Sequence, residues 1–291
     1  MKKLLVVACL LPLLVAAQAP VDSVKVWKTG GSASVNFSQV SLSNWVAGGK
    51  SSASGTFLVN LYGNYQKDNV SWENTLDLGY GLLKEEDAKV LKSDDKIDFS
   101  SKFGYKASGK FFYSALLSFR SQFTDGYDYK IEERPVISRF LAPAYITMAL
   151  GMDYKPNEHF SLFLSPLTGK MTLVTDDALS EAGAFGVDEG AKSRWELGAF
   201  LKTTLKYELV KNVSLESKFD VFSNYLDQPQ NMDVNWDVTI NMKVNSFMSA
   251  KLITNMIYDN DIKIDVDNDG TVDGPRVQFK ELFGVGLNVK F

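Results

Sequence analysis

RVQFKELFGVGLNVKF, residues Arg276–Phe291, closes the chain, and its second half alternates in polarity. One set of positions is apolar and the other is mostly small or polar: Phe283, Val285, Leu287, Val289 and Phe291 against Leu282, Gly284, Gly286, Asn288 and Lys290. Successive side chains of a strand point to opposite faces, so the two sets lie on opposite faces of a sheet. The pattern predicts a long amphipathic strand, although alternation alone also fits a soluble sheet.

The apolar set of this strand continues to an aromatic residue, Phe291, at which the sequence ends. A long amphipathic strand with an aromatic C-terminus resembles the insertion signal of bacterial outer-membrane barrels. The resemblance implies that this strand closes a barrel in the outer membrane.

The first residues have the layout of a secretory signal. A charged head, Met1-Lys2-Lys3, precedes the apolar run Leu4–Ala17, which is too short for a membrane-spanning helix. Small residues allow cleavage before Gln18 or before Pro20, and the proline favours the first site. We therefore expect a signal peptide over 1–17, or up to 19. A short periplasmic segment over 18–26 and one β-barrel domain over 27–291 would follow.

Composition excludes several classes of site. The only cysteine, Cys9, lies in the expected signal, so the mature chain has no disulfide, thiolate metal site or cysteine nucleophile. Loss of Lys2 and Lys3 leaves 29 of the 31 basic residues against 35 acidic ones, a net charge of −6, which does not favour nucleic acid. No later apolar run approaches the length of a membrane helix, but a closed barrel spans a membrane without one.

Twelve segments alternate well enough to be predicted as strands, and none has a helical period. They are residues 27–40, 52–66, 70–83, 96–106, 110–123, 144–154, 160–174, 194–209, 213–225, 234–244, 248–258 and 276–291. The seventh is expected to bend at Ser165–Gly169.

The connections between these segments alternate between short and long. The short ones are 67–69, 107–109, 156–159, 210–212 and 245–246; the longer ones are 84–95, 124–143, 175–193, 226–233 and 259–275, with 41–51 intermediate. Brief periplasmic turns and longer outer loops are typical of outer-membrane barrels. The sequence therefore predicts an all-β protein, an up-and-down antiparallel transmembrane β-barrel of about twelve strands with both termini in the periplasm.

Aromatic residues on the outward face are predicted to gather at two heights. Near the short turns lie Tyr65, Trp72, Tyr105, Tyr113, Tyr154, Phe160 and Tyr207; near the long loops lie Tyr80, Phe99, Phe123, Trp195, Tyr225, Trp236 and Tyr258. Two aromatic bands around an apolar belt of ~25 Å are typical of membrane barrels.

Several segments resemble those of a known family. Asn36–Trp45 with Gly48-Gly49 is similar to the opening motif of an uncharacterised outer-membrane family found in Bacteroidetes, a domain of unknown function. Leu76–Gly81, Ser165–Lys170 and Gly274–Lys280 also resemble family segments, and together they cover nearly all the mature chain. The resemblance implies a barrel in the outer membrane and carries no known activity or catalytic residues.

Charged side chains are predicted on the inward face of the strands. They are Glu73, Asp77, Asp98, Lys102, Lys106, Arg120, Glu196, Lys202, Lys206, Glu216, Lys218, Asp220, Asp237, Lys243 and Lys251. Burying so many charges away from water costs too much free energy unless they form ion pairs or remain hydrated. Two hypotheses follow: a narrow aqueous channel for small solutes, or a non-conducting structural or partner-docking barrel laced shut by ion pairs. The mixed signs argue against strong ion selectivity.

The last outer loop contains alternating carboxylates around a glycine. Asp265, Asp267, Asp269, Thr271 and Asp273 match the front of an EF-hand-type calcium loop. Arg276 stands where the bidentate glutamate would be, so the ligand set is incomplete, and a solvated turn is the alternative. Calcium is the one cofactor that the sequence suggests.

An outer-membrane hydrolase is the weaker alternative, because it would need a serine–histidine pair. The sole histidine, His159, lies in a predicted periplasmic turn, so no enzyme is expected. The expected partners are outer-membrane lipid, the barrel-assembly machinery during insertion, and small solutes.

Overall fold

The computed structural model describes residues 26–42, 50–85, 89–129, 131–262, 264 and 274–291. In this part of the chain, twelve strands hydrogen-bond in a closed antiparallel ring. They are β1 (Trp27–Val40), β2 (Ser52–Lys67), β3 (Val70–Glu85), β4 (Leu91–Ser108), β5 (Phe111–Ser121), β8 (Ala144–Asn157), β9 (Phe160–Leu173), β10 (Ser193–Val210), β11 (Val213–Asn224), β12 (Met232–Lys243), β13 (Met248–Tyr258) and β14 (Gln278–Lys290).

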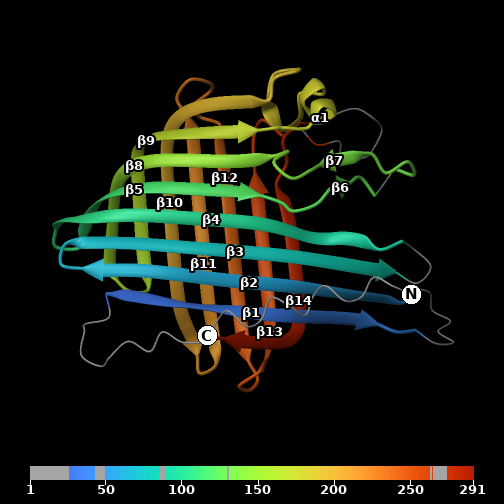
Figure 1. Ribbon diagram of the computed structural model, residues 1–291, viewed down its shortest axis with the longest axis horizontal. Helices are drawn as coiled ribbons and strands as arrows, with labels where there is room; N and C mark the ends of the chain where they lie inside the picture. Colours follow the sequence, from blue (N-terminus) through green and yellow to red (C-terminus); the bar gives the residue numbers. More distant parts are fainter. Residues whose placement is uncertain (1–25, 43–49, 86–88, 130, 263, 265–273) are drawn as a thin grey trace, which may run out of the picture.

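The strands follow one another around the ring in chain order, and β14 pairs with β1 to close it. In Figure 1, one wall of the barrel, β1–β5 with β8 and β9, crosses in front of the other wall, β10–β14. This crossing is what tilted strands on opposite sides of a barrel produce. The prediction of a twelve-stranded up-and-down antiparallel barrel is confirmed.

The seam between β1 and β14 is held by backbone pairing from Ser32 opposite Lys290 to Phe37 opposite Val285. The last residue extends the seam: the Gly31 N–H donates to the Phe291 carbonyl at 2.8 Å, and the Phe291 N–H donates back at 3.1 Å. The C-terminal strand β14 therefore closes the barrel, as predicted.

Short turns and long loops segregate to opposite ends, as predicted. The ends of β2, β4, β8, β10 and β12 lead through tight connections into the next strand, while the other ends carry the longer loops. β1 begins and β14 ends at the short-turn end. The loop after β3 is shorter than predicted, because β4 begins at Leu91 instead of residue 96.

The polar start of β4 was wrongly predicted as loop because its acidic run, Asp94-Asp95, is typical of a turn. The carboxylate of Asp95 instead accepts hydrogen bonds from the backbone N–H groups of Phe123 at 2.7 Å and Thr124 at 3.0 Å. Lys92 pairs with the same carboxylate at 2.9 Å. These bonds hold the first residues of β4 against the chain that leaves β5.

The two longest described loops contain small elements of their own. The loop after β5 forms a two-stranded sheet of β6 (Gly126–Tyr127) and β7 (Val136–Ser138). The loop after β9 contains α1 (Asp177–Glu181) and a 3-10 turn, η2 (Ala184–Gly186). The five residues of α1 are too few to show a helical period in the sequence, and the all-β prediction is confirmed.

These loops pack together at the long-loop end of the barrel, where Figure 1 shows α1, β6 and β7 side by side. A buried cluster of Ala142, Val174 and Val187 joins them, and Leu179 and Phe185 pack against it. The Asp176 carboxylate caps α1 by accepting from the Leu179 N–H at 3.0 Å. The loops thus form a small folded cap over one side of this end.

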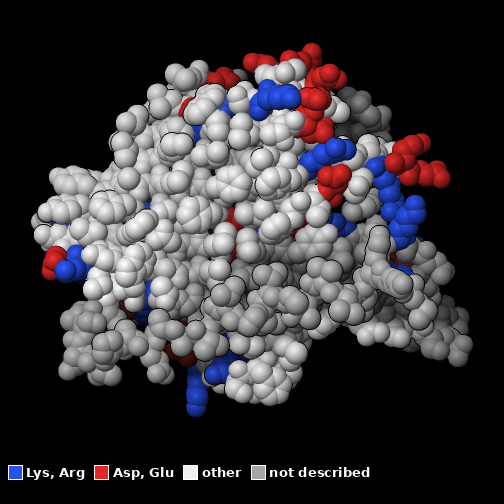
Figure 2. Space-filling model, in the orientation of Figure 1, with Lys and Arg blue, Asp and Glu red and all other residues white. Residues whose placement is uncertain are grey.

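The outside of the barrel wall is apolar. Outward side chains remain largely exposed, including Leu150 at 56%, Met148 at 55% and Phe283 at 57%. Figure 2 shows a broad face with few charged groups, while Lys, Arg, Asp and Glu gather toward the loop end. An exposed apolar surface this large on a monomer marks a contact with lipid or protein. No helix among the described residues is long and apolar enough to cross a membrane.

Exposed aromatic residues lie toward both ends of this surface. Trp27, Trp72, Tyr105, Phe111, Tyr113 and Tyr207 lie toward the short turns, and Phe123, Trp195, Tyr225, Trp236 and Phe279 toward the long loops. Trp27 contacts Tyr65 edge to face and Trp72 at a tilt, with ring centroids 5.3 Å and 5.8 Å apart. The predicted girdle is therefore present in outline, although Tyr65, Tyr80, Phe99, Tyr154, Phe160 and Tyr258 are half-buried in the wall.

An apolar cluster lies on one side of the interior. Leu116 on β5, Ala149 on β8, Phe163 on β9, Phe200 on β10 and Phe222 on β11 are buried together. These five strands are consecutive in the ring, so the cluster lines one side of the barrel. The cluster is a buried apolar core inside the lumen, and it was not predicted from the sequence.

Replacing Leu150 by arginine should destabilise the barrel by ~2–4 kcal/mol, the effect expected for arginine on the lipid face near the middle of a membrane. The measurement is the free energy of unfolding in lipid vesicles. Ile137→Arg is the matched control, because Ile137 is similarly exposed, at 50%, but lies in the loop strand β7. Equal tolerance of both substitutions would mean that lipid does not cover the wall.

Replacing the fully buried Phe163 by alanine should destabilise the barrel by ~3–5 kcal/mol, because it leaves a cavity in the luminal core. Phe283→Ala, on the outward face, should have a clearly smaller effect because lipid chains can fill the space. Unfolding of both variants in the same vesicles provides the comparison. A loss for Phe163→Ala no larger than that for Phe283→Ala would contradict a packed luminal core.

Candidate luminal site

Most of the charged residues predicted on the inward face lie in ion pairs, which form several separate groups. Glu73, Asp77, Asp98, Lys102, Arg120, Glu196, Lys202, Lys206, Glu216, Lys218, Asp220 and Asp237 each pair with an opposite charge. Within the described residues, Lys106, Lys243 and Lys251 have no ion-pair partner. The first two are exposed near the short turns, whereas Lys251 is buried.

Two ion pairs join opposite walls of the barrel. Lys96 on β4 binds Asp237 on β12 at 2.9 Å, and Lys218 on β11 binds Asp77 on β3 at 2.7 Å. In the ring of twelve strands, β4 and β12 are six positions apart, as are β3 and β11, so each pair crosses the full width of the lumen. The side chains are a quarter to a third exposed. These bridges divide the interior.

Arg120 on β5 forms the next layer of the network. Its guanidinium binds Asp98 on the adjacent β4 at 3.2 Å and Asp220 on β11 at 2.6 Å. Lys202 on β10 adds a second cation to Asp220 at 3.2 Å. A guanidinium suits this position because its donors bind two carboxylates at once. This layer lies beside the apolar cluster, since Phe200 and Phe222 are two residues from Lys202 and Asp220.

A third group lies toward the short-turn end. Lys102 on β4 binds Asp153 on β8 at 2.5 Å, and Lys155 binds Glu73 on β3 at 2.7 Å. Asp153 is fully buried and also accepts from the Ser161 hydroxyl at 2.9 Å. Asp153 and Lys155 were not among the residues predicted from the sequence, although they continue the inward parity of Ala149 along β8.

The long-loop mouth is bridged as well. Lys170 on β9 binds Asp233 on β12 at 2.5 Å, and Arg194 on β10 binds Asp261, beyond the end of β13, at 2.5 Å. Burial and the neighbouring carboxylate of Asp233 raise the pKa of Asp259 above its ordinary value. Of this group, only Glu196, which also contacts Lys170 and Arg194, was among the predicted residues.

A polar chamber of about 450 Å³ occupies the half of the lumen opposite the apolar cluster. It is lined from β1–β4 and β11–β14, by residues that include Asn60, Thr239 and Asn255. The cross-lumen pairs of Lys96 and Lys218 form part of its wall. Lys280 on β14 and Asp94 on β4 also line the chamber, and they form an ion pair at 2.7 Å.

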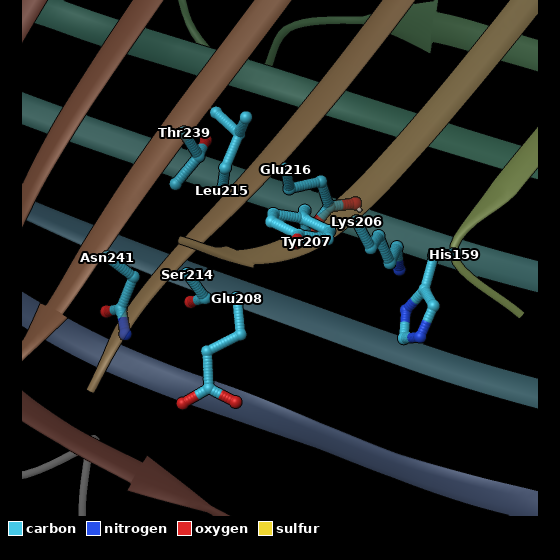
Figure 3. A pocket seen from close by; sticks show the side chains of 9 residues that line it. All are labelled: His159, Lys206, Tyr207, Glu208, Ser214, Leu215, Glu216, Thr239 and Asn241. Atoms are coloured by element: carbon cyan, nitrogen blue, oxygen red, sulfur yellow. Dashed lines mark ion pairs between the residues drawn. The ribbon is translucent and has the colours of Figure 1, made fainter. Parts of the chain in front are cut away.

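A second hollow of about 300 Å³ lies at the short-turn rim and contains His159. Figure 3 shows His159 at one end of this hollow, with Ser214 well removed from it and Lys206 nearer to the imidazole. The backbone carbonyl of His159 accepts from the Lys206 N–H at 2.8 Å. The described residues thus provide no serine–histidine pair at this rim.

The structure describes no arrangement of three or more His, Cys, Asp or Glu that could hold a metal ion among the residues it covers. The predicted calcium ligands Asp265, Asp267, Asp269, Thr271 and Asp273 lie outside the described residues, so calcium binding stays a prediction. The expected signal peptide also lies outside them.

Residues 37–127 match a family model described as "Protein of unknown function (DUF3078)". This range contains most of the segment resembling the family opening motif, and all of Leu76–Gly81. The resemblance to a domain of unknown function is therefore confirmed, over less of the chain than expected. The match indicates no organism, so an origin in Bacteroidetes stays a prediction. No curated protein sequence matches the chain.

Several solved structures have a low similarity to this chain. An outer membrane channel from Pseudomonas putida F1 has 14% identity and a TM-score of 0.41, with 94% of this chain and 100% of that chain covered. The translocator domain of the autotransporter NalP from Neisseria meningitidis has 9% identity and a TM-score of 0.38, with 91% and 88% covered.

OmpT, an outer membrane protein of Vibrio cholerae, has 7% identity and a TM-score of 0.31, with 91% and 97% covered. At this level of similarity, only the residues of the chain itself carry an argument about its function. The chain is a closed twelve-stranded antiparallel β-barrel that matches, over residues 37–127, the DUF3078 family of unknown function.

Proposed function

We propose that this protein is an outer-membrane transport component with an occluded lumen, which takes small polar solutes into its luminal chamber. The observation that carries the proposal is the pair of bridges across the full lumen, Lys96 to Asp237 and Lys218 to Asp77. An open general pore would require these pairs to separate. The hypothesis of a small-solute barrel is therefore retained in a narrower form, with the lumen closed by ion pairs.

The bridges are expected to resist separation. Breaking a buried ion pair by removing one partner costs ~3–5 kcal/mol, because the other charge is left uncompensated in a medium of low dielectric constant. These pairs are partly wetted, so the lower end of that range applies. Two such pairs at the same level would keep the barrel closed most of the time.

The chamber is suited to a small polar solute. Its volume of about 450 Å³ lies at the lower end of the range for small-molecule sites. Asparagine, threonine and lysine side chains line it, and they offer both donors and acceptors. A hydrocarbon solute would leave these groups without partners.

Orientation follows from loop length. In outer-membrane barrels, short turns face the periplasm and long loops face outward. On this basis, both ends of the barrel domain lie in the periplasm, and the cap formed by α1, β6 and β7 lies outside. The chamber residues nearest the short turns, such as Asn241 and Lys290, would then be reached from the periplasm.

A sealed structural or docking barrel is the second candidate. The buried cluster of Leu116, Ala149, Phe163, Phe200 and Phe222 favours it, because a solute pathway has no need for a packed apolar core inside the lumen. A hydrolase has less support, since the rim hollow around His159 provides no catalytic pair among the described residues. We therefore favour a protein that is not an enzyme.

Wild-type protein in planar bilayers should show no sustained conductance, whereas the double variant Asp77→Asn/Asp237→Asn should conduct. The substitutions remove the two carboxylates that bridge the lumen and leave Lys96 and Lys218 only the carboxylates of Asp98 and Glu216, each at 3.6 Å. Because two negative charges are removed from the lumen and the lysines remain, the new current should be carried mainly by anions. Reversal potentials in a salt gradient measure this preference.

Asp177→Asn is the control for that experiment. It breaks an exposed ion pair with Lys192, 2.7 Å long, on the loop cap, and should leave the barrel silent. Migration of unheated samples in gels checks that each variant is folded. Sustained conductance of the wild type would refute the occluded lumen, and silence of a folded double variant would favour the sealed structural barrel.

A further inference from the structure

Lys251 is the buried lysine of the chamber wall that lacks an acidic partner. It lies on β13 with 8% of its surface exposed, and its ammonium group donates to the Ser34 hydroxyl on β1 at 2.8 Å. β14 lies between these two strands, and Gly284 is the residue of β14 opposite Lys251. The absence of a side chain at Gly284 lets Lys251 reach across the closing strand.

The acidic side chains around the chamber are already paired. Its four side-chain carboxylates, those of Asp77, Asp94, Glu216 and Asp237, each form an ion pair with Lys218, Lys280, Lys206 or Lys96. The terminal residue, Phe291, is engaged through its carbonyl oxygen with the Gly31 N–H. Lys251 has no ion pair within the described residues, and the nearby Lys290 repels it. A buried ammonium group in this position calls for an anion.

Polar side chains with unused hydrogen-bonding capacity surround this lysine. Asn36 and Ser249, each 2% exposed, have a side-chain oxygen without a partner, as do Asn241 and Asn288. Asn241 lies opposite Lys251 in the β12–β13 register, and Asn288 lies opposite Ser34 in the seam. Since an amide can present either its oxygen or its NH₂ group, these residues can donate to a bound oxyanion.

We propose that Lys251, Lys290, Asn241 and Asn288 form a binding site for a small oxyanion, a carboxylate or a phosphate, in the luminal chamber at the barrel seam. The ammonium groups supply the charge, and the amides and the Ser34 hydroxyl supply oriented hydrogen bonds. The inference deepens the proposed function by naming the solute class. It also stands as a binding site if the barrel proves not to transport.

The test measures the equilibrium binding of acetate and, separately, of inorganic phosphate to the folded barrel in detergent. Titration calorimetry gives the affinity. We expect saturable binding of at least one of the two anions to the wild type. Lys251→Met keeps the length of the side chain and removes the charge, and should weaken that binding by at least tenfold, the loss expected for one charge-assisted contact. Lys243→Met is the matched control, because Lys243 is an exposed lysine without an ion pair at the same end of the barrel.

Lys290→Gln provides a second variant that does not disturb the packed interior, because Lys290 is exposed at the end of β14. It should also weaken anion binding, by a smaller factor. Absence of binding to the wild type at up to ~100 mM anion, far above the range of specific affinities, would overturn the site. Equal binding by the wild type, Lys251→Met and Lys290→Gln would overturn it too.

The conductance and binding experiments test the transport function and the anion site separately. Anion binding by a barrel that stays silent even after removal of the cross-lumen acids would remove the transport function and leave the site. Opening of the lumen in that double variant, combined with no anion binding to the wild type, would support the transport function and remove the site.

Discussion

Pairing of every backbone polar group along the strands is the constraint on which this structure depends. Hydrocarbon offers no hydrogen bonds, so a sheet can cross it only if its first and last strands meet. Here the meeting of β1 and β14 is held by a register from Ser32 to Phe37 and by the two bonds between Gly31 and Phe291. Closure fixes the circumference, and the circumference decides which side chains can reach one another across the lumen.

Because side chains alternate along each strand, the two faces of the barrel wall meet different environments. Outward positions such as Leu150 and Phe283 leave their surface to lipid, while inward positions carry charges that must find partners or water. A lysine and an aspartate from opposite walls meet at 2.7–2.9 Å, so the barrel is narrow enough for its charges to neutralise one another directly. Mixed signs on the inner face thus produce bridges more readily than an ion-selective pore.

The parity of side chains could be predicted from the sequence, because it depends only on position along a strand. Strand number, loop alternation and the inward direction of residues such as Asp77 and Lys218 followed from it. Which inward charge meets which across the lumen could not be predicted, since that depends on tilt and stagger around the ring. Lys96, Asp153 and Lys155 were missed because they stand near predicted strand ends. The core around Phe163 was missed because its inward apolar side chains stand among polar residues along the same strands.

The interior is asymmetric, and the asymmetry bears on function. On the β5 and β8–β11 side, the lumen contains a buried apolar cluster beside ion-paired side chains, and the polar chamber is lined from β1–β4 and β11–β14. A barrel shaped only for stability would gain from extending the apolar packing, because replacing buried charge by packed hydrophobic residues is often neutral or stabilising. Lys251 instead keeps a buried positive charge with no acidic partner in the described part of the chain, beside amides that are also unsatisfied. Such an arrangement is unfavourable without a ligand and favourable with one, which is the property expected of a binding site.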